Sequence, residues 1–475
     1  MNKFMKLFAT FFLVFALTAC RNNTVETEVY PEIEVGQLGF PLLNLTSAAR
    51  DYALADFDYL AEILLDNTPS LVIIERRWNL TLAELLDDVR SMIYNYEPVE
   101  SLHHLLMGED FADFSLDLPT DDLELAAHYL SSLLFWLSVD LGGIGHLGPR
   151  DFPTYWEQLE HAAALMHQAD IIDGRLVVPD EEPGWDIRLA QSRFDAFAAE
   201  QTLLFFDVDM DDLDLDRELS DIGFREEGNV STEVLVPGSV AYFRIDSFSN
   251  NPGFDSEILF PFFAEVRNYD HLIIDLRGNG GGWSHYFPNY VVATLIPETI
   301  VVNKHEFFMG GDLSLQLAEY SLASWFGSAY EILRADEFVA QHDFTYFNND
   351  DLSVLEYVIP WELIIEPNSD EHIPFEGQIW LLVNEGSASA SESAAVIATS
   401  SGFATVVGTN TMGVTGTMHT YVSLPSTGVL FRIDIGYTID EHGRLMEEFG
   451  VTPDIVIDPD EDALEIVLEL IEKTN

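Results

Sequence analysis

The sequence predicts a layered α/β core preceded by a small all-helical domain. From residue 234 to the C-terminus, short strands alternate with helices, and the segment 272–276 is a fully apolar run. Such runs are typical of strands that are buried on both faces of a sheet. Between residues 46 and 141, apolar residues recur instead with helical spacing. A chain of 475 residues, 48% of them hydrophobic, is long enough and apolar enough for two or three domains.

The first twenty residues resemble a leader segment. Lys3 and Lys6 precede an apolar run at 7–17, which is too short to span a bilayer. The run ends at residues 17–20 in Leu-Thr-Ala-Cys, which resembles the lipobox of bacterial lipoprotein signal peptides, whose cysteine is lipidated. Cys20 is the only cysteine, so an internal disulfide is excluded. We expect export and a lipid anchor at Cys20 on the cell membrane or surface, with an ordinary cleaved secretory peptide as the alternative.

An extended tether at 21–40 leads to the helical domain, residues 41–148. Its apolar spacing predicts helices at 56–65, 80–94 and 123–137. The domain closes in a loop with four glycines around His146, where backbone can approach another group closely.

Residues 149–232 form a connecting region with helices predicted near 155–168 and 187–199. The acidic run 207–218 places acids at positions one, three, five and twelve of a calcium loop, but Asp212 stands where that loop needs glycine. A solvated acidic loop is the favoured interpretation, and calcium binding is the alternative.

The core, residues 233–475, is predicted from its periodicity. Predicted strands are 240–245, 272–276, 299–302, 379–383, 404–407, 421–424 and 430–437, and predicted helices are 254–267, 286–295 and 462–472. The span from 303 to about 376 is expected to be irregular.

The net charge of −61 excludes nucleic acid and anionic membrane surfaces as natural partners. An acidic, solvated coat is the default explanation of this charge. We expect no metal and no organic cofactor.

The stretch 378–395 suggests a nucleophile. A buried strand at 379–383 turns at 384–386 and enters a helix whose first turn is rich in serine. First-turn N–H groups lack intrahelical partners and carry the positive end of the helix dipole, so they stabilise an oxyanion. The alternative is a capping box, because Ser389 and Glu392 are three residues apart.

Three stretches, 274–282, 384–392 and 447–456, resemble in order and separation those of C-terminal-processing (tail-specific) serine peptidases and tricorn core peptidases. The resemblance covers residues 234–460. It implies a crotonase-like core of stacked ββα units and cleavage of polypeptides or peptides. It also implies that Ser389 is the nucleophile and that the backbone N–H groups of Ala390 and Gly281 are oxyanion donors, which agrees with the physics of a helix start and a glycine-rich turn.

The general base departs from the tail-specific pattern, because Val414 occupies the position of that group's lysine. From their places in the chain, neither Lys304 nor Lys473 is expected to replace it. Histidine titrates near neutral pH, and the tricorn-type pattern places the base on His146 and the acid on Glu447. His419 and His285 are the alternatives for the base.

No PDZ-like peptide-binding module is recognisable between residues 146 and 234. Two further functions stay open: a catalytically silent protein that binds peptides or apolar ligands, and an acyl-CoA enzyme. An exported chain without a basic phosphate cradle disfavours the acyl-CoA enzyme.

Overall fold

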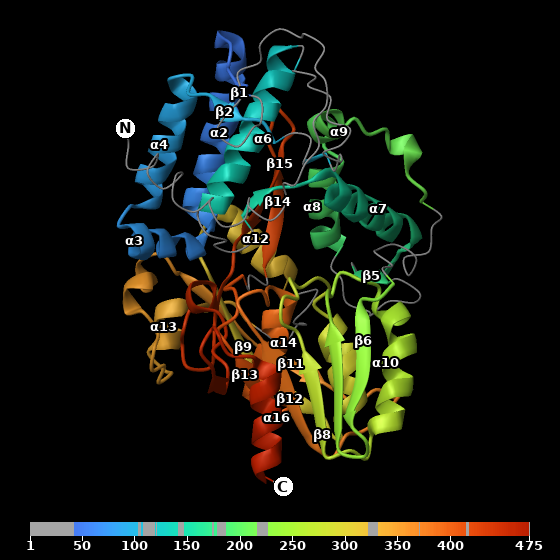
Figure 1. Ribbon diagram of the computed structural model, residues 1–475. Helices are drawn as coiled ribbons and strands as arrows, with labels where there is room; N and C mark the ends of the chain where they lie inside the picture. Colours follow the sequence, from blue (N-terminus) through green and yellow to red (C-terminus); the bar gives the residue numbers. More distant parts are fainter. Residues whose placement is uncertain are drawn as a thin grey trace, which may run out of the picture. The chain divides into compact units, whose positions relative to one another are not determined.

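The structure is a computed structural model that describes residues 42–102, 106–107, 119, 121–140, 147–172, 175–177, 187–215, 227–321, 331–369, 371–414 and 418–474 (Figure 1). The chain divides into two compact units. The helical unit comprises 1–167, 190–215 and 420–433, and the sheet unit comprises 168–189, 216–419 and 434–475. Each unit is described by itself.

The helical unit is built on the helices that the apolar spacing predicts. Thr46 caps the first, and a Thr81–Glu84 capping box starts α4. The segments predicted as helical at 56–65, 80–94, 123–137, 155–168 and 187–199 are confirmed. The helices are α2 (Ser47–Asn67), α3 (Val72–Trp78), α4 (Leu82–Tyr94), α6 (Asp122–Asp140), α7 (Phe152–Gln168), α8 (Ile187–Phe197, which spans the division) and α9 (Glu200–Phe206). A short β1–β2 pair joins Leu42–Leu43 to Val99–Glu100.

A hairpin from late in the chain completes this unit. Strands β14 (His419–Ser423) and β15 (Leu430–Asp434) form a three-stranded sheet with β3 (Gly148–Pro149), in the order β14-β15-β3. Asp56 on α2 accepts hydrogen bonds from the N–H groups of Ser426 and Thr427 at 2.9 and 2.8 Å. These bonds fasten the hairpin tip to α2, so segments some 370 positions apart share one unit.

The sheet unit contains a six-stranded sheet in the order β17-β13-β12-β8-β7-β6. Its strands are β6 (Val230–Val236), β7 (Val240–Ile245), β8 (His271–Asp275), β12 (Gln378–Val383), β13 (Thr405–Gly408) and β17 (Ile455–Val456). Only β6 is antiparallel to its neighbour. The carboxyl ends of β7, β8, β12 and β13 therefore meet at one edge.

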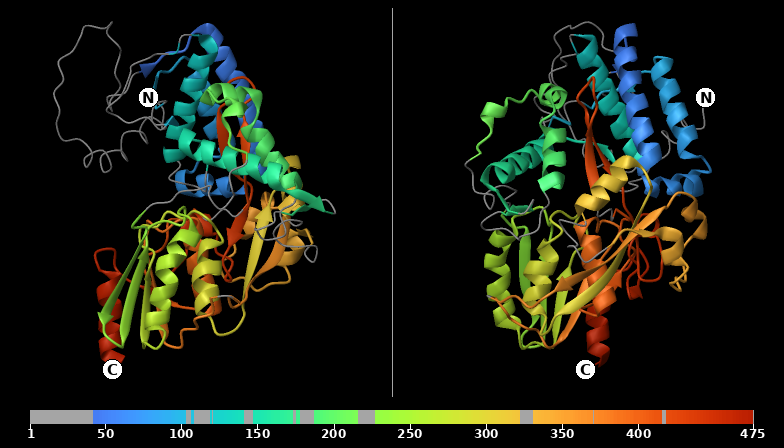
Figure 2. Two further views of the ribbon diagram at one scale, coloured as in Figure 1. Left: turned by 90° about the vertical axis from the view of Figure 1, so that its right-hand side faces the viewer. Right: turned by 180° about the vertical axis from the view of Figure 1, so that it is seen from behind.

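Helices cover both faces of this sheet, as the apolar strands predict. On one face, Ile274 and Leu381 pack with α10 (Pro252–Val266) and α14 (Ala390–Ser401). On the other, Ile273 and Leu382 pack with α16 (Ala463–Thr474). The left view of Figure 2 shows the strands between α16 in red and α10 in lime green. The predicted mixed α/β class is confirmed.

The prediction of an irregular span from 303 to 376 is wrong. Strand β9 (Ile300–Phe308) pairs along its whole length with β11 (Tyr357–Ile365) in a four-stranded antiparallel sheet, ordered β10-β11-β9-β16. The charged residues of β9 and Pro360 within β11 obscure the strand pattern, and the pairing joins segments far apart in the chain. Between β9 and β11 the chain also forms α12 (Asp312–Ser321), β10 (Leu333–Arg334) and α13 (Ala335–Val339). Strand β16 (Tyr437–Ile439) follows later in the chain.

The helix predicted at 286–295 is present as a π-helix (Phe287–Val292) followed by α11 (Ala293–Leu295). A two-stranded pair, β4 (Asp170–Ile172) and β5 (Arg175–Val177), also belongs to the sheet unit. In the part of the chain that is described, no helix is both long and apolar enough to cross a membrane.

Candidate active site

Ser389 occupies a strained turn between β12 and α14. It is the N-cap of α14, with φ 55° and ψ −117°. A non-glycine residue held there costs about 1–3 kcal/mol, and such strain clusters at functional sites. A sharp strand-to-helix turn of this kind presents a serine hydroxyl at the top of a sheet. The backbone N–H of Ser389 donates to Glu392 Oε2 at 3.0 Å and to the Val414 carbonyl at 2.8 Å.

Glu392 does more than cap the helix. Its carboxylate is fully buried and accepts hydrogen bonds from Thr411 Oγ1 at 2.6 Å and from the N–H groups of Gly413 and Val414 at 2.7 Å each. Burial raises the pKa of Glu392, and these hydrogen bonds oppose that rise. Because the Ser389 N–H binds the same carboxylate, Glu392 fixes the segment 411–414 against the serine turn.

Gly281 lies directly beside the serine. A Cβ on Gly281 would stand 2.7 Å from Ser389 Cβ and 2.9 Å from the Ala390 nitrogen, and its φ is +95°. The contact therefore requires glycine. The Gly281 N–H, however, donates to the buried Asn279 Oδ1 at 2.9 Å. The role of this N–H as an oxyanion donor stays a prediction. To act in that role, the Gly281 N–H would have to break its hydrogen bond to Asn279 Oδ1.

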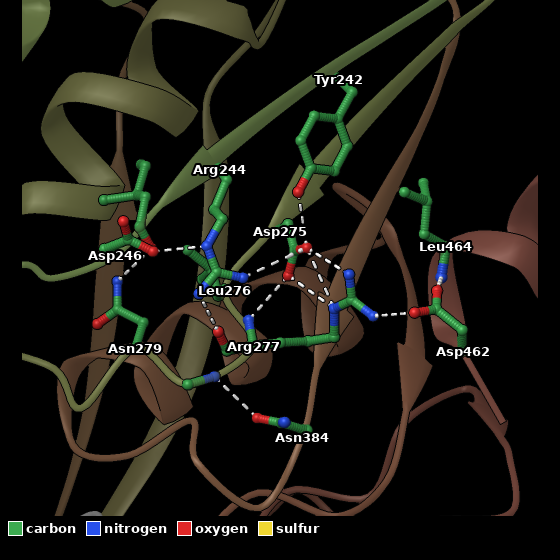
Figure 3. A network of polar contacts seen from close by, with 12 residues as sticks. Tyr242, Arg244, Asp246, Asp275, Leu276, Arg277, Asn279, Asn384, Asp462 and Leu464 are labelled. Carbon is green, nitrogen blue, oxygen red and sulfur yellow. Dashed lines mark hydrogen bonds and ion pairs between the residues drawn. The ribbon is translucent and has the colours of Figure 1, made fainter. Parts of the chain in front are cut away.

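The glycine-rich loop is held at the end of β8 by a charged network (Figure 3). Asp275 is fully buried and binds Arg277 through both oxygens, at distances down to 2.7 Å, and accepts from Tyr242 Oη at 2.8 Å. Arg244 donates to the Arg277 carbonyl at 2.9 Å, and Arg277 also reaches Asp462 at 3.2 Å. The carboxylates raise the pKa of Arg277, so its charge is permanent.

The β8 and β12 turns are also joined directly. Asn384 Oδ1 accepts hydrogen bonds from the N–H groups of Gly278 at 2.8 Å and Gly386 at 3.0 Å. Ser387 Oγ is buried and donates to the Leu276 carbonyl at 2.8 Å. Ser387 therefore has a structural role, whereas Ser391 Oγ is buried and has no hydrogen-bond partner in the described part of the chain.

Glu447 reaches the same neighbourhood. It is 1% exposed on α15 (Met446–Phe449), and a Cβ on Gly413 would lie 3.1 Å from its carbonyl oxygen. Thr411 Oγ1 accepts the N–H of Val451 at 2.7 Å. The segment 411–414 thus contacts both the serine turn and the residues around Glu447, so all three stretches singled out in the sequence meet in the sheet unit.

The candidate proton acceptors lie in several separate segments of the chain. His146 and Cys20 lie outside the described residues. Val414, in place of the lysine, is buried and apolar and cannot act as a base. His285 is exposed, with its ring 5.6 Å from Trp283, and His419 begins β14.

Lys304 was not expected to act as the base, because of its position in the sequence. It is 7% exposed on β9, a strand that packs against α14, and its Nζ lies 5.5 Å from the Trp361 ring centroid. Burial lowers the pKa of Lys304 to about 8, against the opposing charge of Glu306. This burial, which accompanies the β9–β11 pairing, is not evident from the place of Lys304 in the sequence.

Residues 239–457 match Peptidase family S41. This segment is therefore a domain similar to the serine peptidases of that family. The match confirms the resemblance inferred for residues 234–460.

Solved structures resemble the chain more distantly. Mature CPAF complexed with lactacystin is 15% identical over 90% of this chain and 98% of its own, with a TM-score of 0.46. The photosystem II D1 C-terminal processing protease is 20% identical over 49% of each chain, with a TM-score of 0.31. The tricorn protease is 16% identical over 50% of this chain and 18% of its own, with a TM-score of 0.29.

Proposed function

We propose that this chain is an exported, lipid-anchored serine peptidase with a crotonase-like core that cleaves polypeptides or peptides. The reaction is acyl transfer: the Ser389 hydroxyl attacks the peptide carbonyl, the amine leaves, and water releases the acyl group. The observation that carries the proposal is the strained Ser389 turn, which sets this hydroxyl at a helix start beside Ala390 and Gly281.

We assign the base to His146 and the orienting acid to Glu447. An imidazole accepts a proton near neutral pH, and Val414 leaves no lysine at the usual position. Activity should then rise through one pKa at about 6–7, and His146→Ala should lower kcat on the order of 10²-fold with little change in KM. Lys304→Met should leave that pH profile in place. A profile that is lost in Lys304→Met and kept in His146→Ala would transfer the role to Lys304.

A fluorophosphonate probe tests the nucleophile. Wild type should be labelled and Ser389→Ala should not be, while turnover of a peptide mixture is lost in parallel. Ser391→Ala is the matched control, because its hydroxyl is two residues away and makes no hydrogen bond in the described part of the chain. Equal labelling of wild type and Ser389→Ala would contradict the assignment.

A second function, a catalytically silent protein that binds peptides or apolar ligands, is supported by one observation. The Gly281 N–H already donates to Asn279, so one presumed oxyanion donor is occupied. Folded wild type that takes up no probe and cleaves no peptide, yet binds peptides in calorimetry, would favour this function.

The anchor is tested separately. Cys20→Ser should release the protein from the membrane fraction or stall its processing, because the acyl chains supply most of the membrane affinity. Unchanged fractionation would rule out lipidation at Cys20 and leave the peptidase proposal untouched.

A further inference from the structure

A cavity of about 250 Å³ opens beside helix α13 in the sheet unit (α13 in Figure 1). Its wall is formed by α13 and by the segment that follows this helix, up to residue 352. The lining includes Asp336, Ala340, His342, Asp343, Phe344 and Phe347. No lining residue belongs to the serine turn, the glycine loop or the segment around Glu447, so the cavity is separate from the candidate active site.

Aromatic rings form an apolar wall of this cavity. Phe347 is 8% exposed, and its ring centroid lies 6.1 Å from that of Phe344 and 5.5 Å from that of the buried Phe307. The ring of Phe344 also stacks with that of His342 at 5.4 Å, with an interplanar angle of 13°. These contacts hold the rings in place, so the wall is preformed and an alkyl stem could pack on it without rearrangement.

The polar side of the cavity offers hydrogen-bond acceptors. His342 Nδ1 lies 2.8 Å from the Phe338 carbonyl oxygen, and since a carbonyl can only accept, the ring proton lies on Nδ1. In the neutral ring, Nε2 then carries a lone pair. Asp343 is exposed and has no ion pair within the described part of the chain. Asp336, by contrast, lies 3.5 Å from Arg334 Nε, so its charge is partly balanced and Asp343 is the dominant charge.

Acceptors beside an apolar wall favour a ligand that carries donors and a positive charge on an apolar stem. A metal ion is the less suitable occupant, because the described residues contain no group of three or more His, Cys, Asp or Glu side chains that could hold one. Sites for drug-sized molecules have volumes of at least about 300 Å³, so a ligand of this cavity must be small. The net charge of −61 attracts cations to the protein surface.

We propose that this cavity binds a small aliphatic amine in its protonated form, a primary ammonium group on a short alkyl stem. An ammonium group has three donors and no acceptor, which complements the Asp343 carboxylate and His342 Nε2. The stem would pack on Phe344 and Phe347, whose ring faces also attract positive charge. This binding is independent of Ser389 and goes beyond the peptidase function.

Three probes with a common stem test the proposal on the full-length protein. n-Butylamine is protonated at pH 7, as a lysine side chain is, whereas n-butanol is neutral and sodium butyrate is negative. Titration by ligand-observed nuclear magnetic resonance at fixed ionic strength should show saturable binding of n-butylamine. The affinity for n-butanol should be about tenfold lower or less, because it lacks the charge-assisted hydrogen bond, and butyrate should not bind. No saturable binding of n-butylamine, or equal binding of n-butanol, would overturn the proposal.

Variants at exposed positions test the cavity itself. Asp343→Asn keeps the shape of the side chain and removes its charge, so it should weaken n-butylamine binding by about tenfold or more. Ala340→Leu keeps every charge and fills the cavity, and its helical backbone, at φ −63° and ψ −17°, accepts leucine, so it should weaken binding to a similar extent.

Asp350→Asn is the matched control, because Asp350 is an exposed acid of the same segment that does not line the cavity. It should leave the affinity for n-butylamine unchanged. Equal weakening in Asp350→Asn and Asp343→Asn would reduce the effect to general charge. Undiminished binding in Ala340→Leu would place the amine outside the cavity. Either result would overturn the proposal.

Discussion

The ends of β8 and β12, neighbours in the six-stranded sheet, are held in two different ways. At the end of β8, Asp275 and Arg277 form a charged pair two residues apart, extended by Tyr242 and Arg244. At the end of β12, Glu392 gathers N–H and hydroxyl donors from residues up to 22 positions away and meets no cation in the hydrogen bonds described.

The difference follows from what each end supports. The charged pair tolerates partial exposure, since the Arg277 side chain is 21% exposed, and it fixes the shape of a glycine loop. The Glu392 site is fully buried and maintains a strained Ser389. Strain persists only where the surroundings over-determine the conformation, so a serine in this state needs several simultaneous hydrogen bonds.

Gly281→Ala should produce the largest effect, because Gly281 belongs to the β8 loop and touches the β12 turn. The new Cβ would meet Ala388 O and Ser389 Cβ at 2.7 Å, at a φ that L residues rarely adopt. We expect a loss of about 3 kcal/mol or more in the free energy of unfolding and loss of probe labelling. Gly280→Ala, where a Cβ meets nothing within 4 Å, is the control for chemical denaturation. Equal stability of the two variants would show that the contact is not rigid.

Arg277→Gln should produce the second-largest loss of stability. It removes the guanidinium that lies 2.7 Å from the fully buried Asp275. The remaining partners are the Tyr242 hydroxyl, the backbone N–H of residue 277 and a more distant Arg244 at 3.6 Å. An uncompensated buried charge costs about 3 kcal/mol, and urea unfolding measures the loss. Arg267→Gln, an exposed arginine in the same unit, should change little. A cost for Arg277→Gln no greater than that of the control would mean that the pair does not hold the loop.

Glu392→Gln should cost about 2 kcal/mol, because an amide cannot accept all the hydrogen bonds of a carboxylate. The cost should depend on pH. Burial raises the pKa of Glu392 in the folded state, so the folded protein binds more protons than the unfolded one above the ordinary glutamate range.

The contribution of Glu392 to the free energy of unfolding should therefore fall as pH rises from the ordinary glutamate pKa through the raised pKa of Glu392. The difference in unfolding free energy between wild type and Glu392→Gln should narrow over the same pH range. Glu385→Gln, an exposed neighbour, should show no such trend. If the difference in unfolding free energy between wild type and Glu392→Gln widens with pH, the hydrogen bonds lower the pKa of Glu392 more than burial raises it.

Ser391→Ala should have the smallest effect, within about 0.5 kcal/mol or slightly stabilising, since it removes a buried hydroxyl that makes no hydrogen bond in the described part of the chain. Ser387→Ala should cost about 1–2 kcal/mol, because Ser387 Oγ donates to Leu276 O and accepts from Asn384 N–H. Thermal unfolding of both variants compares them, and the reverse order would contradict this account of the turn.

The sequence by itself determined the α/β class, most helices and strands, and the place of Ser389 between a strand and a helix. These features are local: hydrophobic periodicity, capping residues and turn residues act over a few positions. The family resemblance likewise depends on short stretches in a given order.

Only the tertiary structure decided what those stretches touch. The pairing of β9 with β11, the hold of Glu392 on 411–414 and the close approach of Gly281 to Ser389 join residues that are far apart in the chain. Arg150 and Tyr421, 271 positions apart, likewise meet only in the folded chain. No local pattern encodes such contacts, because burial and charge at each residue depend on neighbours that the folded chain alone brings together.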